Sequence, residues 1–445
     1  MNNQLRNIPK IDKIVQNSSF KGYNQKLLLK ITKSKIDLLR EDLLKNEQQK
    51  VDESKLIQDI KNSYKKIFAP SLKPLINATG VILHTNMGRS LIDGEILNRA
   101  SKVICNYSNL EYDLKNGCRG ERYEHVSSHL KNLLGTEDVL VVNNNASAVF
   151  LVLNTFAKNR EVVVSRGELV EIGGSFRIPE VMSQSGAILK EVGTTNKTKL
   201  SDYKNAISEN SAMLMKVHQS NFSIEGFSES TPYKEIKKLS EQNNLLDYYD
   251  LGSGYIPKLP YKLGQKEPSL IEILKSNPSL ISFSGDKLFG SVQAGIIAGK
   301  KELIDKLKKN QLLRMLRVDK ITLSILEETI KAYLKEEYKL IPTLHMLFRD
   351  IKELEKMAIE VKEKVGSNLL KIVKSTTVMG GGTLPNREFS TIALSIDGKA
   401  EKLESLFREK DIIGRIENDK FLLDFRSIRK DDLEKLITTI KEVLA

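Results

Sequence analysis

Lys287 is the residue whose type and position best suit covalent chemistry in this chain. It ends the polar turn Ser284-Gly285-Asp286-Lys287, which lies between the apolar runs LISF and AGIIAG. Two apolar, β-rich runs around a polar turn predict a strand end, and functional sites are often built at strand ends. An amine held there can form a Schiff base with the aldehyde of pyridoxal 5'-phosphate. A single lysine decides little, because the chain contains 70 Lys and Arg residues.

Asp250 supplies the companion that such a lysine needs. It ends the apolar run LLDYY and is followed by Leu-Gly-Ser-Gly, which places a carboxylate where the pyridinium nitrogen of this cofactor requires one. The interval between Asp250 and Lys287 holds one helix and one strand, which is one crossover unit of a parallel sheet. An aspartate after a strand is usually a turn or cap residue. The pair together therefore predicts a pyridoxal-phosphate enzyme.

A phosphate site is predicted where the strand DVLVV meets the helical run ASAVFLVLNTFA. Small and amide residues at a helix N-terminus expose backbone N–H groups that bind phosphate. An ordinary helix cap explains the same residues equally well when they are taken alone. Ser284, three residues before the lysine, is a further candidate for the phosphate. The candidates at the helix start are Asn144, Asn145, Ala146 and Ser147.

Two histidines lie near these positions. His218 follows another predicted strand, and we expect its side chain to reach the ring or the ring hydroxyl of the cofactor. His84 is expected to approach the same site. A histidine at a strand end is more often a structural residue than a ligand, and that alternative stays open for both.

Several long sequence segments resemble the bacterial selenocysteine synthase family, the L-seryl-tRNA(Sec) selenium transferases. The resemblance runs from about residue 70 to about residue 325 and is weaker toward both ends. The segments that show this resemblance are INATGVILHTNMGRS, YSNLEYDL, VVNNNASAV, VVVSRGELVEIGGSFRIPEVM, VGTTNKT, SGDKLFG and LRVDKITL.

This resemblance implies a reaction and roles for the site residues. Seryl-tRNA(Sec) would lose the serine hydroxyl by β-elimination, and selenium from selenophosphate would add to the β-carbon. Lys287 would act as general acid and base, and Asp250 would keep the ring nitrogen protonated. Asp286 would tune the charge of the lysine or of nearby arginines. The family's anion-binding arginines match Arg89, Arg314 and Arg317, of which the last two are three apart and are expected to share a helix face.

The chain departs from the family pattern just after the lysine. The family commonly continues Leu-Leu-Gly-Gly-Pro-Gln-Ala-Gly, whereas this chain has Leu-Phe-Gly-Ser-Val-Gln-Ala-Gly at positions 288–295. Losing a glycine and a proline changes the conformations that a turn can adopt. We expect a shifted loop and intact chemistry.

Composition indicates a cytoplasmic protein that binds a polyanion. The 445 residues include two cysteines, Cys105 and Cys118, outside any paired-ligand motif, so neither a disulfide framework nor a metal site is indicated. No apolar run approaches the length of a membrane span, and no secretory signal is recognisable. Residues 1–70 hold 15 Lys and Arg against 8 Asp and Glu, a net +7 of the total +13. Clustered positive charge suits nucleic acid, although a lysine-rich surface also serves solubility.

The predicted order of elements gives three domains. Residues 1–70 form a basic helical domain and linker, which in the resembling family helps to hold the tRNA. Residues 71–325 form the cofactor-binding domain, and residues 326–445 form a small α+β domain. A long helical region from 321 to 365 spans the boundary between these two domains. The fold class is α/β, an aspartate-aminotransferase-like fold (fold type I) with a mostly parallel sheet and one antiparallel neighbour. The predicted strands are 139–142, 161–165, 188–193, 212–218, 245–250, 280–286 and 294–300.

Two other functions remain open from sequence alone. A pyridoxal-phosphate lyase or aldolase of the same fold, acting on a small amino or sugar acid, would have no evident use for the basic segment before Pro70. A tRNA-binding protein with an inactive core would have no need of Lys287, Asp250 and the arginines. The resemblance also implies a homo-oligomer built from dimers, as large as a decameric ring, because sites of this fold usually borrow residues from a second subunit.

Overall fold

The computed structural model describes residues 3–45, 50–169, 171–172, 176–224, 226–265 and 267–445. The chain divides into two compact units, Met1–Pro74 and Leu75–Ala445. The predicted boundaries at residues 70 and 325, and the roles of the three predicted domains, stay predictions. Among the described residues, no helix is both long enough and apolar enough to cross a bilayer.

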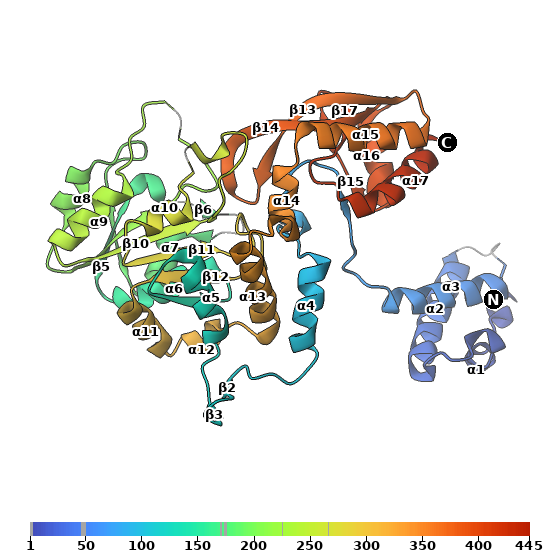
Figure 1. Ribbon diagram of the computed structural model, residues 1–445. Helices are drawn as coiled ribbons and strands as arrows, with labels where there is room; N and C mark the ends of the chain where they lie inside the picture. Colours follow the sequence, from blue (N-terminus) through green and yellow to red (C-terminus); the bar gives the residue numbers. More distant parts are fainter. Residues whose placement is uncertain (1–2, 46–49, 170, 173–175, 225, 266) are drawn as a thin grey trace. The chain divides into compact units, whose positions relative to one another are not determined.

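The first unit is helical (Figure 1). Helix α2 (Gln25–Lys45) and helix α3 (Glu53–Phe68) pack through Leu28, Ile36 and Ile60, which are all fully buried. Asp52 caps α3 by accepting a hydrogen bond from the N–H of Lys55. The remaining helical segments are η1 (Asn3–Asn7), α1 (Ile11–Val15) and η2 (Ser18–Phe20).

The second unit is organised around a seven-stranded sheet, as predicted. Strand β12 runs antiparallel to both of its neighbours, and all other pairs are parallel. The antiparallel strand follows β11 too closely for a crossover helix, which confirms the predicted exception. The strands, in sheet order, are β4 (Asp138–Val142), β12 (Gly295–Gly299), β11 (Leu280–Ser284), β10 (Leu246–Gly252), β9 (Ser211–Val217), β5 (Glu161–Ser165) and β8 (Ile188–Val192).

Helices cover both faces of this sheet, which is why its inner strands are mostly apolar, whereas the edge strand β8 carries Lys190 and Glu191. Residues of β11 alternate between the two faces: Ile281 and Phe283 pack into one cluster and Leu280 into the other. The first cluster includes α5 (Glu124–Leu134), α10 (Leu270–Leu274) and α13 (Lys320–Leu334); the second includes α6 (Asn145–Phe156), α7 (Ile178–Ser185) and α11 (Lys301–Lys309). Near the β8 edge lie α8 (Leu200–Ala206) and α9 (Tyr233–Gln242).

The C-terminal part is a four-stranded antiparallel sheet with helices against it (Figure 1). The predicted helical region over 321–365 is helical but divided into separate helices, because Glu336 adopts a positive φ of 57° and Pro342 starts a new helix. Strand β13 was not predicted. The elements are η6 (Tyr338–Leu340), α14 (Pro342–Phe348), α15 (Ile351–Val365), β13 (Leu370–Gly380), β14 (Thr383–Ile396), α16 (Ala400–Glu409), β16 (Arg415–Glu417), β17 (Lys420–Asp424), η7 (Lys430–Asp432) and α17 (Leu433–Leu444).

The segment that enters the second unit runs along this C-terminal sheet before it reaches the large sheet. Strand β1 (Ile76–Asn77) pairs in parallel with β15 (Ile412–Ile413). Gly80 lies so close to Asp424 that a Cβ would approach its carboxylate to 2.5 Å, so glycine is required there. The path then reaches η3 (Thr85–Met87) and α4 (Gly94–Ile104). The short pairs β2 (Tyr112–Asp113) with β3 (Cys118–Arg119) and β6 (Glu171–Ile172) with β7 (Phe176–Arg177) complete the described strands.

Candidate active site

Lys287 is buried at the end of β11, with 6% of its surface exposed. Backbone hydrogen bonds hold its turn, from Gly285 N to Ala294 O at 2.8 Å and from Gly290 N to Lys287 O at 2.9 Å. Gly290 has a φ of 77°, and a Cβ there would meet Ile341 at 2.5 Å, so the glycine retained at this position has a conformational reason. Within the described chain, the lysine Nζ makes no hydrogen bond or ion pair.

The surroundings of Lys287 favour its neutral form. Burial lowers the pKa of Lys287, and the positive charge of Arg89 lowers it further. The carboxylates of Asp250, Asp286 and Glu267 oppose this shift. A lysine that loses its proton more readily is a better nucleophile and a better base.

Asp250 lies on β10, next to the strand that carries the lysine. Its Cα is paired with Ser282 of β11, two residues before that strand ends. Oδ1 of Asp250 accepts hydrogen bonds from Asn145 Nδ2 at 2.7 Å and from Gly252 N at 3.1 Å. Burial raises the pKa of Asp250, and no cation of the described chain lies within ion-pair distance of this carboxylate. The structure therefore leaves a buried acid without a counter-ion.

The start of α6 leads from this carboxylate to a set of free N–H groups. Asn144 caps the helix by accepting from Ser147 N at 2.9 Å, so the predicted serine uses its backbone in the cap. Among the described residues, no acceptor takes the N–H groups of Asn145 and Ala146, as expected for the first turn of a helix. Asn145 Oδ1 is buried and has no hydrogen-bond partner.

Neighbouring residues fix this helix start in place. A Cβ on Gly295 of β12 would lie 2.1 Å from Asn144 O, so only glycine lets the strand approach the helix. Ser284, at the end of β11, is opposite Gly295 in the register and is buried. The start of α6 and the end of β11 therefore lie at the edge of the sheet near Asp250.

The two predicted histidines have different surroundings. The backbone N–H of His218 donates a hydrogen bond to the backbone oxygen of Asp250 at 2.8 Å. The imidazole Nε2 of His218 lies 2.9 Å from Glu267 Oε2. Glu267 is buried and also accepts from Ser253 Oγ at 2.7 Å. His84 has a buried Nδ1 without a hydrogen-bond partner, and burial lowers its pKa. Sequence reasoning missed Glu267, because it lies in a loop without a recognisable pattern.

The three predicted anion-binding arginines fall into two groups. Arg89 Nη1 lies 2.7 Å from Asp286 Oδ2, beside the lysine. Arg317 lies 3.4 Å from Glu111 instead. Arg314 and Arg317 line one cavity of about 350 Å³ together with Arg119 and Arg122. Arg89 and Arg317 thus pair with different carboxylates, Asp286 and Glu111.

The prediction that Arg314 and Arg317 share a helix face was wrong. Helix α12 (Leu313–Leu316) ends before Arg317, which has the extended angles φ −75° and ψ 141°. Arg317 forms an isolated antiparallel bridge with Val142, the last residue of β4. A strand-like contact therefore replaces the helical spacing, and it holds Arg317 next to the end of β4.

Comparison with known proteins decides the family. The family model described as L-seryl-tRNA selenium transferase matches residues 75–429. The chain belongs to this family. L-seryl-tRNA(Sec) selenium transferase from Aliarcobacter butzleri is 59% identical over 99% of this chain and 98% of the relative. The protein of the same name from Sulfurimonas denitrificans is 56% identical over 99% of both chains.

A solved structure supports the fold of this selenium transferase family member. D-glucosaminate-6-phosphate ammonia-lyase superposes with a TM-score of 0.62, covering 86% of this chain and 98% of its own, at 16% identity. At that identity the likeness concerns the fold alone. It agrees with the fold type I class that was predicted from sequence.

Pyridoxal phosphate fits the residues present in this selenium transferase family member. The ring nitrogen, when protonated, carries the positive charge that the buried Asp250 lacks. A phosphate carries the acceptors that the N–H groups of Asn145 and Ala146 lack. The aldehyde needs an amine of lowered pKa, and Lys287 provides one. Among the described residues, Asp250 and Lys287 have no ion-pair partner and the two N–H groups have no acceptor.

Proposed function

We propose that this protein converts L-seryl-tRNA(Sec) to L-selenocysteinyl-tRNA(Sec) with pyridoxal phosphate and selenophosphate. The observation that carries the proposal is the family match over residues 75–429, which spans both Lys287 and Asp250. Full-length relatives bear the name of this reaction. Membership of this family favours the transferase over a small-molecule lyase and over a tRNA-binding protein with an inactive core.

The cofactor supplies an electron sink for the bond changes at the serine α- and β-carbons. Asp250 would hold the ring nitrogen, and the first N–H groups of α6 would hold the phosphate. Lys287 would bind the aldehyde when no substrate is present and would otherwise carry protons at its Nζ. Its lowered pKa suits both tasks, because a neutral amine attacks the aldehyde and accepts a proton, and an ammonium of lowered pKa gives that proton up more readily. His218, fixed by Glu267, would border the ring.

Arg89 is proposed to receive the anionic selenium donor. Its guanidinium lies beside the turn that carries the lysine and is held by Asp286. Arg89 has a positive φ of 61°, which is uncommon for a residue with a side chain. Such strain is retained where the surrounding structure gains from it. Arg314 and Arg317 are proposed to bind anionic substrate groups in the cavity around Glu111.

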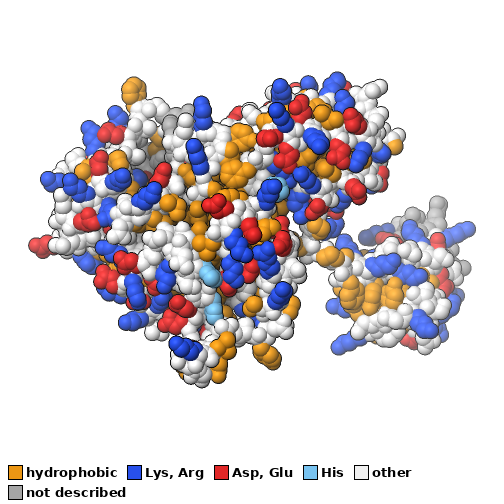
Figure 2. Space-filling model, in the orientation of Figure 1, with side chains coloured by type: hydrophobic (Ala, Val, Ile, Leu, Met, Phe, Trp, Pro, Cys, Tyr) orange, Lys and Arg blue, Asp and Glu red, His pale blue; other side chains and the backbone are white. Residues whose placement is uncertain are grey.

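The helical unit of residues 1–74 is proposed to bind the tRNA. Figure 2 shows several Lys and Arg side chains on the visible face of this unit, in line with the net charge of +7 in residues 1–70. Contacts between these cations and phosphates would release counterions and weaken with added salt. We further propose cytoplasmic location and assembly of the chain as dimers or rings of dimers.

Selenium transfer onto serylated tRNA tests the proposed function. The full-length chain with pyridoxal phosphate should convert seryl-tRNA(Sec) when selenophosphate is present and should not act on free L-serine. Lys287→Ala should abolish both the product and the absorbance band of the Schiff base between the lysine and the cofactor. Deletion of residues 1–74 should abolish transfer while the absorbance remains, because the lysine lies in the other unit. Turnover of free serine in place of seryl-tRNA would support the lyase instead.

A further inference from the structure

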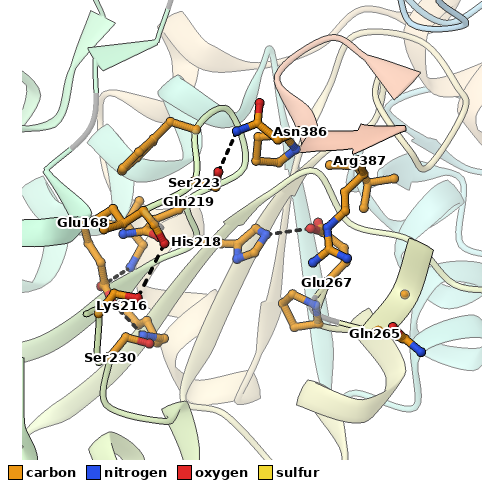
Figure 3. Close-up of a pocket in the computed structure, with 18 of the residues that line it drawn as sticks. Glu168, Lys216, His218, Gln219, Ser223, Ser230, Gln265, Glu267, Asn386 and Arg387 are labelled. Carbon is orange, nitrogen blue, oxygen red and sulfur yellow. Dashed lines mark hydrogen bonds and ion pairs between the residues drawn. The ribbon is translucent and has the colours of Figure 1, made fainter. Parts of the chain in front are cut away.

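A polar cavity of about 780 Å³ lies beside the candidate active site. The C-terminal end of β9, Tyr249 of β10 and the first part of β14 contribute to its lining. Figure 3 shows two acid–base pairs in this cavity, Glu168 with Lys216 and Glu267 with His218. Neither Lys287 nor Asp250 lines it. The volume is in the range that holds small-molecule ligands.

The pair of His218 and Glu267 connects this cavity to the candidate site. His218 belongs to the cavity wall, and its backbone N–H donates to Asp250 O. Glu267 belongs to the same wall, and its charge raises the pKa of Lys287. A ligand in this cavity would therefore lie against His218, which is hydrogen-bonded through its backbone to Asp250.

Arg387 is the unusual residue of the cavity. It follows the tip of the β13–β14 hairpin, is half-buried, and makes no hydrogen bond or ion pair within the described residues. In Figure 3 its guanidinium extends from β14 into the cavity, toward Glu267. Lys216 and His218 each have a carboxylate partner at 2.6 and 2.9 Å, and the carboxylate of Glu272 is at an exposed position. Arg387 thus offers a free cation to an anion in the cavity.

The remaining lining has the chemistry of a nucleoside site. Glu168 and Glu267 have further lone pairs that can accept hydrogen bonds from ribose hydroxyls. Gln219 and Gln265 carry amides that can pair with a base edge, and Phe222 offers an aromatic face for stacking. Asn386, near the tip of the β13–β14 hairpin, donates a hydrogen bond from Nδ2 to Ser223 Oγ at 2.8 Å. This contact holds the hairpin over the cavity.

We propose that this cavity binds the terminal nucleotide of the tRNA acceptor end and that Arg387 binds its 5'-phosphate. This inference rests on the proposed function. In an aminoacylated tRNA the serine is esterified to the terminal ribose, so its carboxyl group carries no charge and the nucleotide must lie beside the reacting carbon. A free amino acid would bring a carboxylate to Arg387 instead. Arg387 is therefore a residue that selects the class of substrate.

Binding of two probes to the cofactor-loaded, full-length chain tests this proposal. Adenosine 5'-monophosphate carries the phosphate, and adenosine lacks it. We expect calorimetry to give about tenfold tighter binding of the monophosphate to the wild-type chain. Arg387→Ala should reduce this preference to about twofold or less, and Arg387→Lys should retain part of it. Arg408→Ala, which removes an arginine paired with Glu404 on α16, should keep the full preference.

Absorbance of the bound cofactor, unchanged in all three variants, shows that each is folded. Equal binding of the two probes to the wild type, no binding of either, or a preference that survives Arg387→Ala overturns the assignment. It is also overturned if Arg387→Ala weakens binding of L-serine and leaves the monophosphate unaffected. Selenium transfer by the wild-type chain onto seryl-tRNA is measured separately. The proposed function can therefore stand when the nucleotide site fails.

Discussion

Arg89 Nη1 lies 2.7 Å from Asp286 Oδ2, and Asp286 immediately precedes the buried Lys287. The two charges act on the lysine in opposite directions: the pKa of Lys287 is lowered by Arg89 and raised by Asp286. The ion pair joins positions 197 residues apart in the sequence. It makes the protonation of the lysine depend on a residue from the segment that runs along the C-terminal sheet.

Variants of this ion pair should shift the pH dependence of cofactor binding in opposite directions. Arg89→Ala removes the lowering charge and leaves Asp286 unpaired, so the pKa of Lys287 should rise. Asp286→Asn removes a raising charge, so the pKa should fall. The rate at which the cofactor-free chain reacts with pyridoxal phosphate is followed by absorbance at a series of pH values. The midpoint of this pH profile should shift by about half a pH unit or more in each variant. Shifts of the same sign in both variants would contradict the assigned charges.

The unpaired carboxylate of Asp250 should cost stability when no cofactor is bound. Because its folded-state pKa is raised, the folded chain binds more protons than the unfolded chain just above the ordinary pKa, and stability falls as pH rises through that window. Asp250→Asn should remove this loss and raise the melting temperature of the cofactor-free chain at neutral pH by about 2 °C or more. Thermal unfolding at several pH values measures it.

Asp424 is the matched control for this experiment. It is also buried with a raised pKa, but it forms an ion pair with Arg415 and accepts from Thr391 Oγ1 at 2.6 Å. Asp424→Asn should lower the melting temperature, because it removes the buried partner of Arg415 and leaves that arginine with only the more exposed Glu417, at 3.2 Å. If both asparagine variants change stability in the same direction, the missing counter-ion of Asp250 is not the cause.

Arg317→Glu should leave the absorbance of the bound cofactor unchanged and abolish use of the selenium donor. The new carboxylate would lie beside Glu111, which now accepts from Arg317 at 3.4 Å, so the cavity would lose one of its cations and gain an anion at that point. Arg119→Glu is the control, because Arg119 contacts the same carboxylate at 3.1 Å but has a mostly exposed side chain. Steady-state rates against selenophosphate concentration separate the two. Normal turnover by Arg317→Glu would remove this arginine from the site.

Arg426 should be a large contributor to stability. Its side chain is fully buried, donates to Ser390 O at 2.9 Å and to Met346 O at 3.2 Å, and stacks near Tyr261 and Phe389. Arg426→Met would leave those carbonyl oxygens unpaired and should cost about 3 kcal/mol of unfolding free energy. Denaturant unfolding measures this loss, with the exposed Arg408→Met expected to change stability by less than about 0.5 kcal/mol.

The strands and the two central residues could be predicted from sequence because their signals are local. Most strands of the large sheet are short apolar runs bounded by polar residues, so pattern and composition determine them. Asp250 and Lys287 come at or just after such runs, and parallel neighbours bring their ends to one edge of the sheet. The antiparallel β12 was predictable for the same reason, since its connection to β11 is too short for a crossover.

Contacts between distant segments were decided only by the tertiary structure. Asn145 reaches Asp250 across 105 residues, and Glu267 reaches His218 across 49, through loops with no periodic pattern. The spacing of Arg314 and Arg317 predicted a shared helix face, whereas the bridge to Val142 ends the helix first. Sequence determines which residues can form a strand or carry a charge. Tertiary packing determines which charged side chains become neighbours, because it brings segments that are distant in sequence together. The charges around Lys287 were decided in this way.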